Sequence, residues 1–156
     1  MHKVHATADR RIGAPAALVY RLIADAQNHH GRFLPPAFSN FRVERGGYGA
    51  GTVIAFDLKL GSVARPGRME IAEPQPGRVM TEADPTSDLV TTWTVDAHGE
   101  ACRVRIETAW TPRGGPRGLV ERLFAPGMLR RLYADELRRL DAYARTQAGV
   151  GGSASS

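Results

Sequence analysis

The chain has 156 residues, 42% hydrophobic and 24% charged, which are ordinary values for one globular domain. No apolar run is long enough to span a membrane and the first residues lack a signal-peptide core, so we expect a cytoplasmic protein without stable membrane insertion. The net charge is +5, but basic and acidic residues are interleaved, which argues against a nucleic-acid partner. Cys102 is the only cysteine, which excludes an internal disulfide and a cysteine-based metal cluster.

Residues 3–34 predict a strand followed by two short helices. Residues 3–12 alternate apolar and polar side chains, as a half-buried strand does. Pro15 suits the first turn of a helix, which is expected to end near Ala24 and to bury Leu18, Val19, Leu22 and Ile23. Residues 25–34 read as a second, more polar helical segment that stops before Pro35.

Between residues 38 and 111 the apolar period changes to two, which predicts about six consecutive strands. Residues 54–60 form the clearest of them, and His98-Gly99 marks a hairpin turn. Pro66-Gly67 interrupts residues 62–73, so the strand register there cannot be read. Short turns imply an antiparallel sheet with one face in solvent.

Residues 118–144 predict a long amphipathic helix that covers the other face of the sheet. Pro126 is expected to break or kink it into a short first piece and a longer second piece of roughly 30 Å. The short piece is expected at the entrance of a cavity between the helix and the sheet. Its Arg and Glu residues are expected on the solvent side, and residues 148–156 are predicted to be a disordered tail after a single domain at residues 1–147. The apolar stripe consists of Leu119, Leu123, Leu129, Leu132, Tyr133, Leu137, Leu140 and Ala144.

Three stretches carry a resemblance to a known family: RRIGAPAALVYRLIADAQNHHGRFLP, ERGGYGAGTVIAF and LVERLFAPGMLRRLYADELRRLDAYA. Together they resemble the START/polyketide-cyclase (SRPBCC) superfamily, in its polyketide cyclase/dehydrase-like branch. The resemblance implies an α+β helix-grip fold, with a curved antiparallel sheet of about seven strands around a long C-terminal helix. The superfamily includes lipid carriers and cyclases, so function must be argued from the site.

The predicted site is the space between the sheet and the long helix, because a curved sheet and one helix cannot meet closely everywhere. Small-molecule sites are usually such apolar cavities with a few polar groups. The expected ligand-binding residues are Phe33, Phe41, Phe56, Leu58, Met69, Thr91, Trp93, Thr108, Trp110, Met128, Leu132 and Tyr133.

Other motifs have structural explanations. Residues 46–51, GGYGAG, lack the ending of a phosphate-binding loop and fit a hairpin that borders the cavity and could act as a gate. The five histidines show no metal-ligand spacing and are expected on the surface, and Cys102 is expected to be a small buried hydrophobe.

The sequence leaves three functions open. The first is binding of a hydrophobic small molecule, lipid-like or aromatic, without a metal or other cofactor. The second is a cofactor-independent polyketide cyclase or dehydratase, for which Arg65, Glu82 and Tyr133 are the candidates to polarise a carbonyl or move an enol proton. The third, suggested by the resemblance, is a co-chaperone-like interaction module. The enzyme hypothesis requires an inward charged residue with a shifted pKa.

Overall fold

A computed structural model of the chain describes residues 2–153. Its elements are β1 (Val4–Ile12), α1 (Ala16–Ala24), the 3-10 helix η1 (His30–Phe33), β2 (Phe38–Arg45), β3 (Val53–Leu60), β4 (Val63–Gln75), β5 (Val79–Ala83), β6 (Val90–His98), β7 (Ala101–Trp110) and α2 (Gly115–Ser153).

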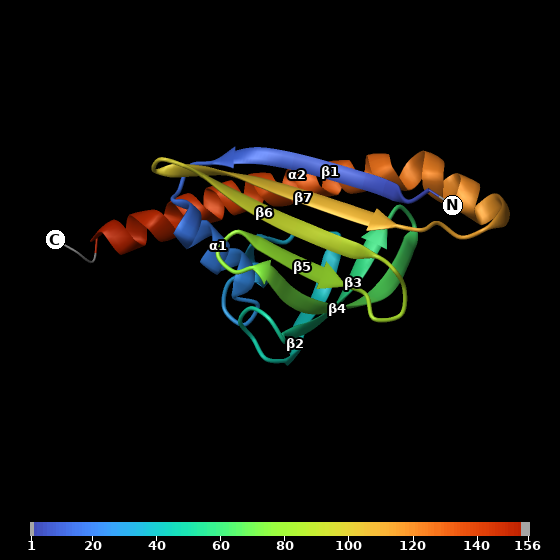
Figure 1. The fold of residues 1–156 in the computed structure, drawn as a ribbon, viewed down its shortest axis with the longest axis horizontal. Coiled ribbons are helices and arrows are strands. Elements are labelled where there is room, and N and C mark those ends of the chain that lie inside the picture. The colour runs from blue at the N-terminus through green and yellow to red at the C-terminus, as the bar shows by residue number, and fades with distance from the viewer. Residues whose placement is uncertain (1, 154–156) are drawn as a thin grey trace.

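The strands form one seven-stranded antiparallel sheet in the order β1-β7-β6-β5-β4-β3-β2. Consecutive strands from β2 to β7 are neighbours, and β1 pairs with β7, so β1 and β2 form the two edges of the sheet. The expected α+β helix-grip architecture is therefore confirmed (Figure 1). The second predicted helix is only the four-residue η1, because Pro35 and Pro36 follow it.

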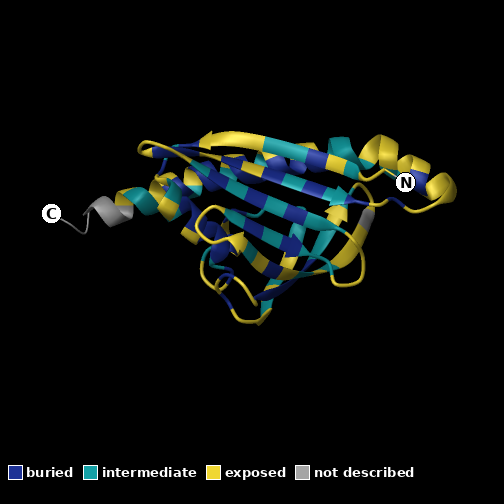
Figure 2. Ribbon diagram, viewed as in Figure 1, coloured by how far each residue is buried: buried dark blue, intermediate teal, exposed yellow. Residues whose placement is uncertain are grey.

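Buried and exposed residues alternate along the strands (Figure 2), which sets one face of the sheet against helix α2. Helix α2 runs along β1 and also contacts α1 and η1. The buried side chains of α2 recur at three- and four-residue spacing from Leu129 to Ala144. Burial of each leucine there stabilises the folded state by about 1.5–3 kcal/mol.

The predicted break at Pro126 and the predicted burial of the first turns of the helix are both wrong. Helix α2 runs without interruption through Pro126, since a proline removes only one backbone hydrogen bond and the bonds on either side hold the helix together, and a kink there stays a prediction. Leu119 and Leu123, expected in the buried stripe, are 59% and 66% exposed because the sheet does not cover this end. The helix is described to Ser153, beyond the expected end at Gln147, and residues 154–156 lie outside the described part.

Candidate functional site

Three ionisable side chains meet in the interior between the sheet and α2. His30 comes from η1, Glu82 from β5 and Glu136 from α2, and each is at most 9% exposed. His30 Nε2 lies 3.8 Å from Glu82 Oε1 and 3.9 Å from Glu136 Oε1. Both separations exceed a hydrogen bond, so the three groups face one another without satisfying one another.

The orientation of His30 is fixed from two sides. Its Nδ1 lies 2.7 Å from the carbonyl oxygen of Ile23, and a carbonyl can only accept, so Nδ1 carries the proton. The neutral ring then presents Nε2 as an acceptor toward the two carboxyl groups. The Phe41 ring is stacked with the imidazole at a centroid distance of 6.1 Å, and the Trp93 ring meets it edge-on at a centroid distance of 5.4 Å. These contacts hold the imidazole in place.

Burial shifts the pKa of each group in the direction that favours the neutral form. It lowers the pKa of His30 to about 4 and raises the pKa of Glu82 to about 7, with the nearby Trp93 N–H opposing the second shift. Burial and then the Glu82 charge raise the pKa of Glu136 well above its ordinary value. Near neutral pH the cluster therefore holds an unprotonated imidazole beside two carboxyl groups that keep much of their protonated form, Glu82 losing its proton around pH 7.

Two polar atoms of the cluster have no hydrogen-bond partner among the described residues: Glu82 Oε1 and Trp93 Nε1. Both belong to buried residues, Glu82 being 9% exposed and Trp93 1%. Leaving such groups unpaired in the interior costs stability, and native proteins do so rarely. These atoms are available to a polar group of a bound molecule.

The sheet register explains why Glu82 points inward. Glu82 is paired with Ile71 on β4 and Thr91 on β6, and Thr91 is paired with Thr108 on β7. Directly paired residues share a face of the sheet, so this row crosses the inner face. Met80, two residues earlier on β5, shares that face and is 1% exposed.

A second polar group lies next to the acid cluster. The Thr108 hydroxyl is hydrogen-bonded to the Tyr133 hydroxyl, and it lies 2.7 Å from that of Thr91. Burial raises the pKa of Tyr133 to about 12, so the phenol stays protonated. The three hydroxyls satisfy one another and join β6, β7 and α2.

A hollow of about 350 Å³ opens where α2 passes the turn between β3 and β4. Met128 and Leu132 line it from the helix, and Leu60 and Gly61 line it from the turn. Leu132 is one helical turn before Glu136, but His30, Glu82 and Glu136 do not themselves line the hollow. Lys59, Arg131 and Asp135 give its rim a mixed charge.

Eleven of the twelve predicted ligand-binding residues are buried or pack against the core, and Met128 lines the hollow; whether they bind a ligand stays a prediction. Most are buried, and four are only partly buried: Phe41, Leu58, Met69 and Met128. Met128 and Leu132 also line the hollow. The ten others do not line it: Phe33, Phe41, Phe56, Leu58, Met69, Thr91, Trp93, Thr108, Trp110 and Tyr133.

The three candidate catalytic residues do not meet at one point. Glu82 belongs to the acid cluster, and Tyr133 to the hydroxyl group beside it. Arg65 is paired with Leu58 and therefore lies on the inner face of the sheet, but it is exposed near the β3–β4 turn. The bend at Pro66-Gly67 does not interrupt the ladder, since β3 and β4 pair through it.

Sequence reasoning missed His30 and Glu136. His30 was expected on the surface, but it is 4% exposed because η1 turns it toward Phe33 and Trp93. Glu136 was expected on the solvent side of α2. It follows Leu132 by four residues and precedes Leu140 by four, so a charged residue within the apolar stripe was the available signal.

The Gly-rich loop is not at this hollow. Gly47 accepts a backbone hydrogen bond from Gln27, and Gly49 donates one to Ala24, so the loop is bound to the end of α1. Gly49 and Gly51 have φ values of 65° and 91°, which favour glycine. The loop is therefore a hairpin that does not line this hollow, and a role as a gate to the cavity stays a prediction.

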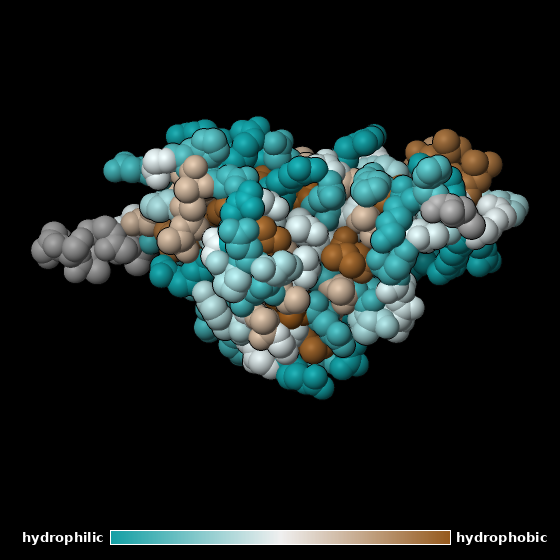
Figure 3. All heavy atoms as spheres, in the orientation of Figure 1, coloured by the Kyte–Doolittle hydropathy of each residue, from teal (hydrophilic) through white to brown (hydrophobic). Residues whose placement is uncertain are grey.

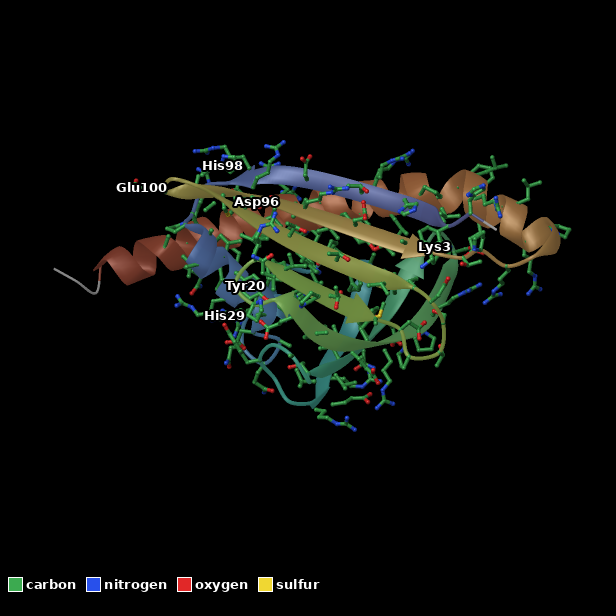
Figure 4. The ribbon with its side chains drawn as sticks, in the orientation of Figure 1. Lys3, Tyr20, His29, Asp96, His98 and Glu100 are labelled. Atoms are coloured by element: carbon green, nitrogen blue, oxygen red, sulfur yellow. The ribbon has the colours of Figure 1, made fainter. Side chains whose placement is uncertain are left out.

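A second hollow of about 520 Å³ lies beside that loop and is lined by Tyr20, Tyr48 and Glu73, among others. Tyr20 donates a 2.7 Å hydrogen bond to Glu73 Oε1. In Figure 4, His98 and Glu100 are labelled at the β6–β7 hairpin. Within residues 2–153, no three His, Cys, Asp or Glu side chains are grouped as metal ligands.

Comparisons with known proteins agree with this architecture. Residues 1–145 match the family model described as "Polyketide cyclase / dehydrase and lipid transport". The solution structure of the KanY protein is 33% identical, with a TM-score of 0.82 over 93% of this chain and 99% of that one. No curated protein matches the chain.

Two more distant structures share the fold. The Zhui aromatase/cyclase from Streptomyces sp. R1128 is 16% identical, with a TM-score of 0.75 over 92% of this chain and 94% of that one. A norcoclaurine synthase from Thalictrum, solved with a transition-state analogue, is 16% identical, with a TM-score of 0.66 over 93% and 96%. With the family model covering nearly the whole chain, the protein belongs to the polyketide cyclase/dehydrase and lipid transport family.

Proposed function

We propose that the protein binds a hydrophobic small molecule, aromatic or lipid-like, between the sheet and helix α2. The observation that carries the proposal is the hollow at Met128, Leu132 and the β3–β4 turn, one helical turn from the acid cluster. Apolar side chains would bury the body of the ligand. The unpaired Glu82 carboxyl and Trp93 N–H would receive a polar group on it.

The chemistry of the cluster indicates which polar group would fit. A protonated carboxyl and an indole N–H are donors, and an oxygen acceptor such as a carbonyl or phenol oxygen would pair with them. A carboxylate ligand would bring a negative charge into an interior where burial already disfavours the charged forms of Glu82 and Glu136. The ligand class favoured here is therefore a neutral, carbonyl- or hydroxyl-bearing ring system or chain.

Uptake of an apolar fluorescent probe tests the proposal. Leu132→Arg would place a charge in the hollow and is expected to weaken uptake by about tenfold or more. Ala134→Arg, exposed on the same helix, is the matched control and is expected to retain uptake. Equal uptake by both variants, with unchanged circular dichroism, would contradict binding at this position. Native mass spectrometry of the purified protein would identify a retained ligand.

The acid cluster favours a second candidate function, a cofactor-independent cyclase or dehydratase. A neutral imidazole can take a proton from a carbon next to a carbonyl, and a protonated carboxyl can donate one to the carbonyl oxygen. The resulting enol could attack a second carbonyl of the same molecule, and loss of the new hydroxyl with a neighbouring hydrogen would release water. His30 and Glu82 would fill these two roles.

Turnover of a polyketone substrate distinguishes this candidate from simple binding. Glu82→Gln would keep the shape of the side chain and remove its acidic proton, so product formation should fall while ligand affinity changes little. A pH–rate profile controlled by a group near pH 7 should disappear in this variant. Retained turnover in Glu82→Gln would exclude Glu82 as the acid and leave the binding proposal intact.

A further inference from the structure

The beginning of helix α2 exposes four large apolar side chains. Leu119, Val120, Leu123 and Phe124 are between 56% and 66% exposed. At 100° per residue they occupy one stripe about 140° wide on the helix surface. Figure 3 shows the corresponding hydrophobic patch at the end of the molecule where α2 begins in Figure 1. Contiguous exposed patches of this kind usually mark an interaction surface.

Arginines surround this patch. The segment from residue 112 to residue 134 contains a single acidic residue and five exposed arginines: Arg113, Arg117, Arg122, Arg130 and Arg131. By helical angle, Arg117 borders the stripe on one side and Arg122 on the other. No ion pair involves any of the five among the described residues.

The one acidic residue is turned away from the patch. Glu121 accepts a 2.7 Å hydrogen bond from Trp110 Nε1 and a 3.3 Å bond from the backbone N–H of Arg113. These bonds tie the first turns of α2 to the end of β7. The exposed face of these first turns of α2 is therefore apolar in the middle and positively charged at its edges. The hydrogen bonds of Glu121 hold this part of the helix in a fixed position.

We propose that this patch, Leu119, Val120, Leu123 and Phe124 with its flanking arginines, docks on an anionic lipid surface. A helix with an apolar stripe between basic residues lies in the interface of a bilayer, and anionic headgroups attract each arginine. Such peripheral docking requires no spanning segment, and none of the described helices is long and apolar enough to span a membrane.

Charge argues against a second copy as the occupant. In a twofold dimer the same patch would meet itself, and the arginines would face like charges. The location of the patch supports a lipid surface. Met128, one helical turn after Phe124, lines the hollow, so docking would bring the hollow close to the bilayer. This last point, that a hydrophobic ligand could enter from the membrane, rests on the proposed function; the docking itself does not.

Flotation with lipid vesicles tests the docking. The intact protein is expected to bind vesicles of phosphatidylcholine with roughly a third phosphatidylglycerol, and to bind pure phosphatidylcholine much less. Leu123→Glu and Phe124→Glu are each expected to weaken binding by about tenfold or more. Arg117→Glu with Arg122→Glu is expected to weaken it similarly, and raised salt should release the protein.

The chain offers a matched control for each change. Tyr48→Glu alters an apolar residue that is 55% exposed on the Gly-rich loop, and Arg45→Glu reverses an exposed arginine on β2. Both should bind vesicles as the unchanged protein does. All replaced side chains are exposed, so unfolding midpoints should stay close together, and a variant that unfolds is replaced by Leu123→Ser.

Three results would overturn the proposal. One is absence of binding to anionic vesicles, and another is equal binding to neutral vesicles. The third is a dimer, seen by analytical ultracentrifugation without lipid, that dissociates in Leu123→Glu. Apolar probe uptake in solution should be unaffected by the patch variants, so failure of docking and failure of ligand binding are distinguishable.

Discussion

His30 Nε2 and Glu82 Oε1 face each other at 3.8 Å in the interior. Burial lowers the pKa of His30 and raises the pKa of Glu82, so both shifts favour the neutral side chains. A charged pair at this depth would gain from mutual attraction but would lose its hydration. Glu136 lies as close to the same nitrogen, so one imidazole cannot neutralise both acids. Burial therefore favours the neutral form of each of the three groups.

This arrangement predicts that stability falls as pH rises toward neutrality. The unfolded chain releases the Glu82 proton near pH 4.5, whereas the folded chain keeps it until about pH 7, so the folded state binds more protons in that window. The raised pKa of Glu136 acts in the same direction. For Glu82 alone the loss is on the order of 3 kcal/mol.

His30 opposes this slope only in part. Its pKa is lowered from 6.5 to about 4, so the unfolded state binds the extra proton there and stability rises with pH between these values. One histidine faces two acids, and the net slope remains downward. Glu136→Gln should therefore raise the unfolding midpoint at pH 8 and flatten its pH dependence in urea denaturation. Glu100→Gln, exposed in the β6–β7 turn (Figure 4), should change neither.

The sheet and the long helix could be predicted because their apolar periods are regular. Residues 54–60 and 102–110 place their large apolar side chains at every second position, and this period of two indicates which face meets the core, although Ala55 on the other face of β3 is also buried. Cys102 was placed correctly, at 0% exposure, by the same alternation. The row from Ile71 to Thr108 across the inner face needed the strand pairings, which the interruption at Pro66-Gly67 concealed.

The acid cluster could not be predicted as a unit, because its members are far apart in sequence and each looks ordinary alone. His30 belongs to a polar segment whose burial depends on how η1 packs against α2. The exposure of Leu119 and Leu123 depends on where the sheet ends. A helical stripe indicates which face is apolar but not whether anything covers it.

Gly67 on β4 is predicted to be essential for the position of Phe56. A Cβ at Gly67 would lie 2.5 Å from the Phe56 ring, too close for any real contact. Gly67→Ala should therefore displace the ring and cost about 1–3 kcal/mol in chemical denaturation. Gly127→Ala is the control, because its Cβ meets nothing within 4 Å and lies in a helix, so it should stabilise by about 0.5–1 kcal/mol. Equal effects of the two changes would show that Phe56 does not pack as described.

Thr108 is predicted to be the critical member of the hydroxyl group. Thr108→Val keeps the shape of the side chain but leaves Thr91 and Tyr133 without their shared partner, which should cost about 1–3 kcal/mol. The hydrogen bond from Thr108 lowers the pKa of Tyr133, so its loss should raise that pKa further, although burial remains the main cause of the shift. Thr92→Val, half-buried on the opposite face of β6, should be nearly neutral in the same unfolding measurement.

Cys102 is predicted to be unreactive until the protein unfolds. The thiol is fully buried on β7, and burial raises its pKa to about 11, so very little thiolate forms at pH 8. A disulfide reagent should therefore label the folded protein only through opening of the β1–β7 region, where Cys102 is paired with Ile12. In guanidinium the same single cysteine should react at once and completely, which provides the internal control. Labelling of the folded protein as fast as the unfolded protein would mean that β1 does not stay paired with β7, and would contradict the burial of Cys102.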